Sequence, residues 1–284
     1  MTSDVLRRAW LLAIGAQLAA SPIAAQSADS VRRARDSTSK ISHDPLFTAR
    51  DAWYAAGFVV GTIALFPLDK QIAKEIRRPD NLSNRFLRNV ANDFQLSASP
   101  GSLIIGGTLY TVGRVGHFDR VADLGLHGTE AIVFAEVVNG LVKGIGGRAR
   151  PYVVNDTNPH DFAFGRGFRK GTDYSSFPSG HTVAGFAAAA AVTSETSRWW
   201  PHSTWLVAPV MFGGATAIGL ARLYNDKHWA SDIIMGAGIG TFSGLKIVRY
   251  NHSHPHNHLD RMLLSASVLP TADGGLAVAF TTTP

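Results

Sequence analysis

The chain has 284 residues and a formal net charge of +6, with 45% apolar and only 17% charged residues. This length suits one sizeable domain, and the composition fits either an exported globular protein or a modest membrane protein. The absence of cysteine excludes disulfides and thiolate chemistry. The basic residues are dispersed or belong to short motifs, which favours an anionic substrate or a membrane surface over nucleic acid.

The N-terminus has the order of a secretory signal. Arg7 and Arg8 precede an apolar run over residues 9–20, and small residues follow up to residue 26. A basic, apolar and small-residue order predicts a signal peptide over residues 1–26. A membrane anchor is the alternative, but the run is short for spanning and is followed by Pro22. The polar residues 27–50 lack apolar periodicity and are predicted to form a flexible leader.

Residues 51–250 are predicted to form an all-α domain, a bundle of about six core helices with the site at one end. Apolar periodicity and helix breakers predict helices over residues 51–66, 69–94 (broken near Pro79), 101–113, 121–143, 182–195, 205–223 and 229–248. Segment 121–143 carries Asp123, His127, Glu130 and Glu136, which would be costly in lipid and therefore indicate a packed or solvated face. His127 is interpreted as a paired helix histidine.

Two further patterns concern packing and the C-terminus. Gly236, Gly240 and Gly244 recur every four residues, which indicates close contact between helices. Residues 251–284 form a separate tail that begins with alternating histidines: His252, His254, His256 and His258. Such histidines can bind zinc or nickel, but the pattern sets no geometry and favours adventitious binding. Residues 263–268 and 276–280 flank a Gly turn and predict a β-hairpin.

The most informative stretch contains Arg222, His228 and Asp232. If a helix starts at residue 229, His228 and Asp232 lie one turn apart on one face. The carboxylate can then accept one imidazole N–H and leave the other nitrogen as a nucleophile, a base or a metal ligand. Arg222 adds a charged fork suited to a phosphate oxyanion. A helical His–Asp pair is, by itself, more often a structural hydrogen bond.

Two other motifs change that interpretation. Lys143 and Arg150 lie seven residues apart across a glycine-rich turn, and Ser179, Gly180 and His181 stand at the start of an alanine-rich helix. In chain order the three motifs read K-x6-R-P, P-S-G-H and R-x5-H-x3-D. If consecutive helices run antiparallel, all three motifs fall at the same end of the bundle.

This ordered set resembles the type 2 phosphatidic acid phosphatase family, whose fold and site are shared with bacterial acid phosphatases and vanadium haloperoxidases. The resemblance covers residues 143–244. One departure is Ala221, where the family usually has serine before the arginine of the third motif. The change removes a hydroxyl near the site but no charged group.

Chemistry and resemblance agree on the expected roles. His228 attacks phosphorus to give a phosphohistidine, Asp232 fixes its tautomer, and His181 protonates the leaving alkoxide and later activates water. The expected phosphate-binding groups are Lys143, Arg150, Ser179, Gly180 and Arg222. Three cations take the place of a metal, so no metal or other cofactor is expected.

The expected function is a metal-independent phosphatase that acts on a phosphomonoester or diphosphate, with a lipid phosphate preferred over a small phosphoester. The alternatives are a vanadate-dependent haloperoxidase, in which His228 would ligate vanadium, a soluble non-specific periplasmic acid phosphatase, and a non-catalytic envelope binding protein. Loop 144–177 also carries Arg166, Arg169 and Lys170, which either gather substrate or form a solvated basic loop.

The expected location is the cell envelope, with the site facing the periplasm. The sequence leaves open whether the domain is embedded in the membrane or is soluble or peripheral, and it does not indicate the oligomeric state. Because segment 101–113 is short for a span and segment 121–143 is charged, the helices are expected to pack mainly on each other.

Overall fold

The computed structural model describes residues 46–82, 89, 100–254 and 257, and the backbone of 266–270 and 276–280. The chain divides into two compact units, Met1–Pro45 and Leu46–Pro284, and every described residue belongs to the second. The predicted signal peptide, the leader up to residue 45, the end of segment 69–94, His256 and His258 lie outside the described residues.

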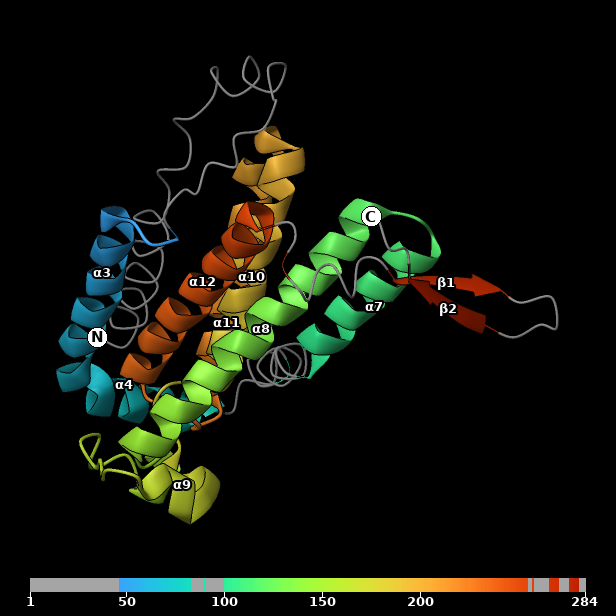
Figure 1. Ribbon diagram of the computed structural model, residues 1–284. Coiled ribbons are helices and arrows are strands. Elements are labelled where there is room, and N and C mark those ends of the chain that lie inside the picture. Colours follow the sequence, from blue (N-terminus) through green and yellow to red (C-terminus); the bar gives the residue numbers. More distant parts are fainter. Residues whose placement is uncertain are drawn as a thin grey trace. The chain divides into compact units, whose positions relative to one another are not determined.

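The domain is an all-α bundle, as predicted (Figure 1). Its α-helices are α3 (Ala49–Leu65), α4 (Asp69–Ile76), α5 (Pro79–Leu82), α7 (Gly101–Val115), α8 (Asp119–Gly146), α9 (Arg166–Lys170), α10 (Gly180–Trp199), α11 (Thr204–Tyr224) and α12 (Ala230–Ser253). Short 3-10 turns occur at Phe66–Leu68, Pro151–Val153, Gly171–Tyr174 and Pro201–Ser203. In the described part of the tail, β1 (Ala266–Pro270) and β2 (Leu276–Phe280) pair antiparallel, with Ala266 opposite Phe280.

Helix α10 is the centre of the bundle and packs against α8, α11 and α12. Its buried face is made of small residues, which allow the neighbouring helices to approach closely. The core where α8 meets α10 contains Ile132, Ala135, Val183, Ala184 and Ala187. Small side chains thus occupy the contact between α8 and α10.

The predicted glycine face of α12 lies directly against α10. A Cβ built on Gly236, Gly240 or Gly244 would come closer than 3.0 Å to a backbone oxygen of α10 or its N-cap. Real Cβ atoms do not approach so closely, so a larger side chain at these positions would push the two helices apart. The glycines thus set the distance between α10 and α12.

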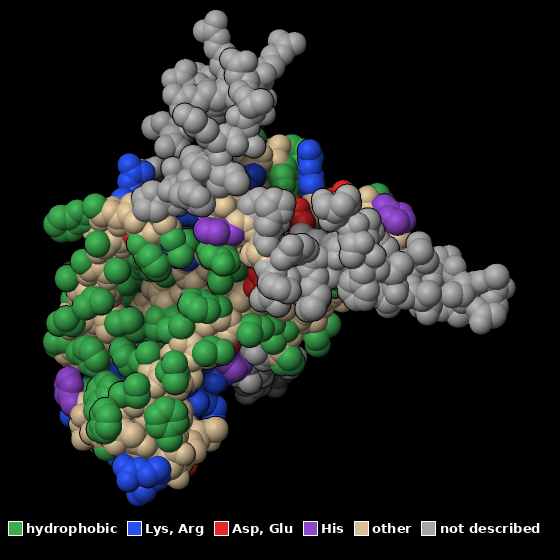
Figure 2. Space-filling view, viewed as in Figure 1, with side chains coloured by type: hydrophobic (Ala, Val, Ile, Leu, Met, Phe, Trp, Pro, Cys, Tyr) green, Lys and Arg blue, Asp and Glu red, His purple; other side chains and the backbone are tan. Residues whose placement is uncertain are grey.

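The outer helices are poorly covered by protein. Two helical segments, Ala49–Ile76 and Pro201–Tyr224, are long and apolar enough to cross a membrane. Trp53 on α3 is 78% exposed and Trp205 on α11 is 77% exposed. Hydrophobic side chains cover much of the face seen in Figure 2. The expectation that the helices pack mainly on each other is therefore wrong for α11, whose apolar face points outward. Helix α3, the first apolar segment, also exposes its apolar face.

Helix α8 separates its charged and apolar residues onto different sides. Asp123, Glu130 and Glu136 are only partly exposed, and His127 is buried. The exposed hydrophobic side chains follow a helical spacing: Val133, Val137, Leu141 and Ile145. The ionisable groups that argued against contact with lipid thus turn toward the protein.

Helix boundaries at the site differ from the predicted ones by up to three residues: α8 ends at Gly146, and α10 begins at Gly180, so that His181 lies in its first turn. Helix α12 begins at Ala230 with Trp229 as its N-cap, one residue later than predicted. His228 therefore lies in the connection that precedes the helix and is not part of its first turn.

Candidate active site

Four helix ends bring the three motifs together. Lys143 in the last turn of α8 donates from Nζ to the carbonyl of Ser175 at 2.9 Å, and Ser179 N donates to the carbonyl of Asp232 at 3.1 Å. Arg150 donates from a terminal guanidinium nitrogen to the carbonyl of Lys227 at 3.2 Å. The antiparallel arrangement expected from the sequence is observed, and all predicted site residues lie at this end of the bundle.

His228 is buried, and its tautomer follows from its neighbours. Nδ1 lies 2.7 Å from the carbonyl oxygen of Ser176 and 3.5 Å from Oδ2 of Asp232. Both oxygens can only accept, so Nδ1 carries the proton and Nε2 keeps its lone pair. Burial lowers the pKa of His228 to about 3, so the ring is neutral at physiological pH. A neutral imidazole of this tautomer is suited to attack through Nε2.

The closest acceptor for His228 is thus a backbone carbonyl, whereas the sequence pointed to the carboxylate of Asp232. That carboxylate serves several other donors. Oδ2 accepts from Trp229 N at 2.9 Å and from Ser176 Oγ at 2.5 Å, and Oδ1 accepts from Arg148 at 2.5 Å. Asp232 occupies the third position of α12 and caps the helix through the Trp229 amide. It therefore links Trp229, the residue after His228, to Ser176 in the loop before α10.

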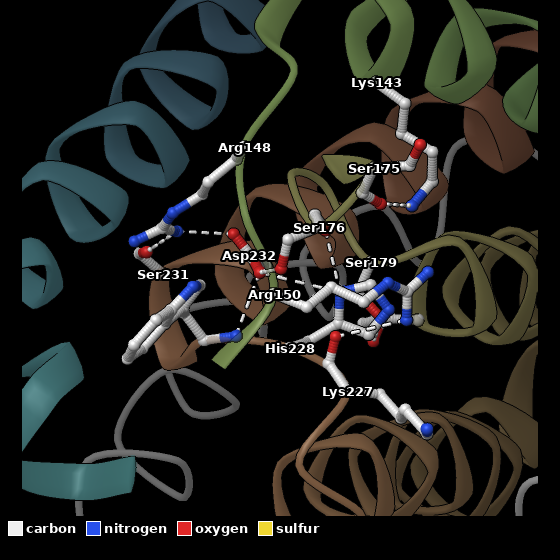
Figure 3. Close-up of polar contacts among 12 residues, drawn as sticks. Lys143, Arg148, Arg150, Ser175, Ser176, Ser179, Lys227, His228, Ser231 and Asp232 are labelled. Atoms are coloured by element: carbon white, nitrogen blue, oxygen red, sulfur yellow. Dashed lines mark hydrogen bonds and ion pairs between the residues drawn. The ribbon is translucent and has the colours of Figure 1, made fainter. Parts of the chain in front are cut away.

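Arg148 was not predicted as part of the site, yet it organises one side of it. The side chain is fully buried and forms ion pairs with Asp232 and with Asp69 of α4, the second at 2.7 Å. Its guanidinium lies 4.9 Å from the ring centre of Phe66 and 5.4 Å from that of Trp229. In Figure 3, Arg148 and Ser176 approach the Asp232 carboxylate from two sides.

Asp69 extends this network to the start of α12. It accepts from the amide of Ser231 at 2.9 Å and from its hydroxyl at 2.5 Å, and Arg148 also donates to that hydroxyl oxygen at 2.7 Å. All three side chains are buried. A buried carboxylate needs such donors. The bonds that Asp69 accepts also hold α4 against the start of α12.

The predicted phosphate-binding cations act on the two histidines, and the charges of Lys143 and Arg150 reach His228. Arg222 is 5% exposed at the end of α11, and its charge, with those of Lys143 and Arg150, acts on His181. Arg150 is oriented by a 2.7 Å bond from Nε to the carbonyl of Thr172. Three cations around two histidines make a volume with a strong preference for an anion.

The N-terminus of α10 adds neutral donors. Ser179 is the N-cap residue, and its hydroxyl oxygen accepts from Thr182 Oγ1 at 2.9 Å. A Cβ at Gly180 would lie only 3.0 Å from the side-chain nitrogen of Asn139, so glycine fits where larger residues crowd α8. The amides of the first helical turn and the helix dipole both favour a bound anion.

The remaining basic residues of loop 144–177 have structural contacts. Arg166 donates to the carbonyl of Gly147 at 2.7 Å and forms a 2.9 Å ion pair with Asp161. Arg169 donates to the carbonyl of Phe164, and Lys170 lies over the ring of Tyr174. These contacts favour a role in holding the loop over a role in gathering substrate.

Known proteins share the fold and part of the sequence. Residues 126–254 match the sequence model of the PAP2 superfamily. They form a PAP2 domain. In the PAP2 domain, α8, α10, α11 and α12 contribute the three motifs, and Ala221, the departure in the third motif, is buried. The α3 and α4 segments, with Asp69, lie outside the matched range.

Two curated relatives align with the PAP2 domain. The lipid A 1-phosphatase of Porphyromonas gingivalis is 36% identical over 90 residues, which is 31% of this chain and 19% of that protein. The undecaprenyl-diphosphatase of Sulfolobus acidocaldarius is 25% identical over 146 residues, which is 51% of this chain and 64% of that protein. The chain thus spans less than two thirds of either relative.

A solved structure supports the fold. The crystal structure of a transmembrane PAP2 type phosphatidylglycerolphosphate phosphatase from Bacillus subtilis superposes with a TM-score of 0.53 at 18% identity. The match covers 74% of this chain and all of that chain. The helices outside the PAP2 match therefore also belong to a known arrangement.

Proposed function

We propose that this protein hydrolyses a lipid phosphate, as a monoester or diphosphate, through a phosphohistidine on His228. The observation that carries the proposal is a buried, neutral imidazole whose Nδ1 is fixed by acceptors. The charges of Lys143 and Arg150 act on it, and together with Arg222 they also act on His181. The ordered motifs and the phosphatase names of both curated relatives support the same chemistry.

In the proposed reaction, Nε2 of His228 attacks phosphorus and the bond to the leaving oxygen breaks. The three cations and the amides at the start of α10 stabilise the equatorial oxygens of the transition state. Burial and the three cations lower the pKa of His181 in the free site, so the proton for the leaving oxygen is brought in by the phosphate ester, bound as its monoanion, and is passed on by His181. In the second step His181 takes a proton from the water that attacks the phosphohistidine. Phosphate leaves, and His228 returns to its neutral form.

The exposed apolar helices favour a lipid substrate over a soluble one. Hydrophobic side chains on α3, α8 and α11 face outward, and α3 and α11 belong to segments long and apolar enough to cross a bilayer. The bundle is proposed to be embedded in the membrane with the motif-bearing end at its surface. A phosphate on a lipid headgroup would then lie at the depth of His228.

A hydrolysis panel tests this proposal. The purified protein in mixed micelles should release phosphate from lipid A, polyprenyl diphosphate, phosphatidylglycerolphosphate or phosphatidic acid, measured beside a soluble sugar phosphate. Brief incubation with a ³²P-labelled substrate should leave acid-labile label on the protein. Hydrolysis of the soluble ester alone would contradict the lipid assignment, and the absence of covalent label at any time would contradict the phosphohistidine.

Replacement of His181 by asparagine should slow alkyl phosphates much more than aryl phosphates. An aryl leaving group needs little protonation, whereas an alkoxide depends on a general acid, a contribution of about 10²–10⁴ in rate. The measurement is kcat for a lipid phosphate and for 4-nitrophenyl phosphate with both proteins. An equal loss on both substrates would count against His181 as the proton donor.

Activity should survive chelators and be inhibited by vanadate. Cations of the chain take the place of a metal, and the trigonal-bipyramidal vanadate ester resembles the phosphoryl transition state. Phosphate release is measured after dialysis against EDTA and then with vanadate added. Loss of activity that zinc or magnesium restores would contradict the proposed site. Peroxide-dependent halogenation by the vanadate-loaded protein, without phosphatase activity, would favour the haloperoxidase.

The site is proposed to face the periplasm. Since α8 and α11 end at the site whereas α10 and α12 begin there, His254 lies at the opposite end of the bundle from His228. In an embedded bundle the C-terminal tail then stays in the cytoplasm, and a phosphatase reporter fused after Pro284 should be inactive. A cysteine in place of the exposed Lys170 should react with an impermeant maleimide from outside. Labelling only from the cytoplasmic side would reverse the orientation.

A further inference from the structure

A second cluster of titratable side chains lies at the end of the bundle remote from the three motifs. It consists of His127 on α8, Glu195 near the end of α10 and His252 at the end of α12. His127 Nδ1 lies 2.5 Å from Glu195 Oε1, and His252 Nε2 lies 2.9 Å from both carboxylate oxygens. Three core helices, α8, α10 and α12, thus direct one ligand-type atom each toward a common point.

The composition of this cluster is that of a transition-metal site. Two imidazole nitrogens and a carboxylate oxygen are the ligands that zinc takes from proteins, at about 2.0–2.2 Å from the ion. The three ligand atoms all lie within 4.8 Å of one another. Neighbouring ligands of a tetrahedral ion with such bonds are about 3.3 Å apart. Small side-chain rotations would therefore convert the observed contacts into a coordination shell.

The charge of the cluster also favours a divalent cation. Glu195 has no exposed surface, and Asp123, one turn before His127 on α8, is close enough to interact with Glu195 and both histidines. With neutral imidazoles the two carboxylates carry two negative charges, and Arg198 on α10 is the cation whose charge acts on Glu195. Buried charges are retained in proteins when they are paired or coordinate a metal. A bound divalent ion would satisfy this requirement.

The cluster is accessible to an ion from solution. The side chain of His252 is 27% exposed, whereas His127 and Glu195 are 3% and 0% exposed. His252 also begins the run of alternating histidines, and His254 is exposed beside it. The buried ligands could hold an ion that enters past His252.

We propose that His127, Glu195 and His252 bind one zinc ion that ties α8, α10 and α12 together, with water as the fourth ligand. The site is structural and separate from the phosphate chemistry, because it lies at the other end of these helices. It differs from adventitious binding by the histidine tail, since two of its ligands are buried in the bundle.

Cobalt(II) substitution tests the site directly. Protein dialysed against EDTA should take up one equivalent of cobalt(II), with the visible absorption bands of a four-coordinate ion. Zinc should displace the cobalt and raise Tm, whereas magnesium should do neither. His252→Asn, a change at the half-exposed rim, should weaken cobalt binding by more than about 100-fold. Glu195→Gln should abolish the absorption in any fraction that folds.

His254→Asn is the matched control, because His254 is an exposed neighbour outside the cluster, and it should leave the cobalt spectrum and Tm unchanged. A spectrum that survives His252→Asn but is lost in His254→Asn would mean that the tail binds the metal adventitiously, and would overturn the proposal. A Tm of the wild-type protein that zinc does not change would also overturn it. His252→Asn should still release phosphate below its Tm, because the cluster lies far from the motifs. A failed metal test therefore leaves the proposed function untouched.

Discussion

Replacement of His228 by alanine should lower kcat for every phosphate ester by about 10⁴ or more, because removal of a nucleophile leaves only the binding and electrostatic contributions. In the structure, the residues on either side of His228 are held without its imidazole: the Trp229 amide donates to Asp232 and the Lys227 carbonyl accepts from Arg150. The loss should therefore come from chemistry and not from unfolding. The measurements are kcat, vanadate affinity and trapping of the phosphoenzyme. Vanadate should still bind to the variant, since Lys143, Arg150 and Arg222 remain.

The control for this substitution is His202→Ala, at an exposed histidine before α11, which should keep full activity. The proposal would be wrong if His228→Ala retained more than a trace of turnover, or if it still formed acid-labile phosphoprotein. Imidazole added to the alanine variant offers a further check, since the vacated space could admit a free nucleophile that restores part of the rate.

Replacement of Arg148 by methionine should destabilise the domain by about 3–5 kcal/mol, the usual cost of leaving a buried charge without its partner. Asp69 and Asp232 are both without exposed side-chain surface, and each loses an ion pair in this variant. The change is measured as the loss of free energy of unfolding or of Tm in detergent. Arg148→Lys keeps the charge but lacks the planar fork that reaches both carboxylates. Its stability should therefore lie between those of the wild type and Arg148→Met.

Arg169→Met is the comparison for Arg148→Met, because Arg169 is an exposed arginine of the same loop. A surface substitution of this kind changes stability by no more than about 0.5 kcal/mol. Equal stability of the two variants would show that the buried network contributes nothing. Asp69→Asn combined with Arg148→Met should recover part of the loss, since one of the two stranded carboxylates is then neutral.

The motif-bearing residues were predicted from their order along the chain and its resemblance to a known family, and two simple regularities placed them at one end of the bundle. Helical periodicity located the helices, and antiparallel order placed Lys143, His181, Arg222 and His228 at the same end. These inferences need only residue type and spacing. The all-α class followed from the same periodicity, and the structure confirms it.

The residues that the sequence did not reveal act through contacts between distant segments. Asp69 and Arg148 are 79 positions apart, and no spacing rule connects them. The acceptor for His228 is the backbone carbonyl of Ser176, which any residue type could supply. Arg148 was visible only as one of several basic residues in a loop, and its burial among aromatic rings required the fold.

The outward apolar face was within reach of the sequence but was misjudged. The four ionisable residues named in segment 121–143 were taken to exclude the whole segment from lipid. Val133, Val137 and Leu141, however, recur every four residues and form an apolar face. Treating each face of the helix separately would have predicted a lipid-facing side. For α3 and α11, long apolar stretches alone did not distinguish a buried core helix from one exposed to lipid.

The contact between α10 and α12 limits how the site at the end of the bundle can change shape. Since a Cβ on these glycines of α12 would collide with the backbone of α10, the two helices pack without a gap, and this contact sets how His181 and Asp232 lie relative to each other. In the proposed function, a headgroup would therefore reach the site past segments outside this pair. The connection over residues 147–179 is one of them, and it carries Arg150 and Ser176.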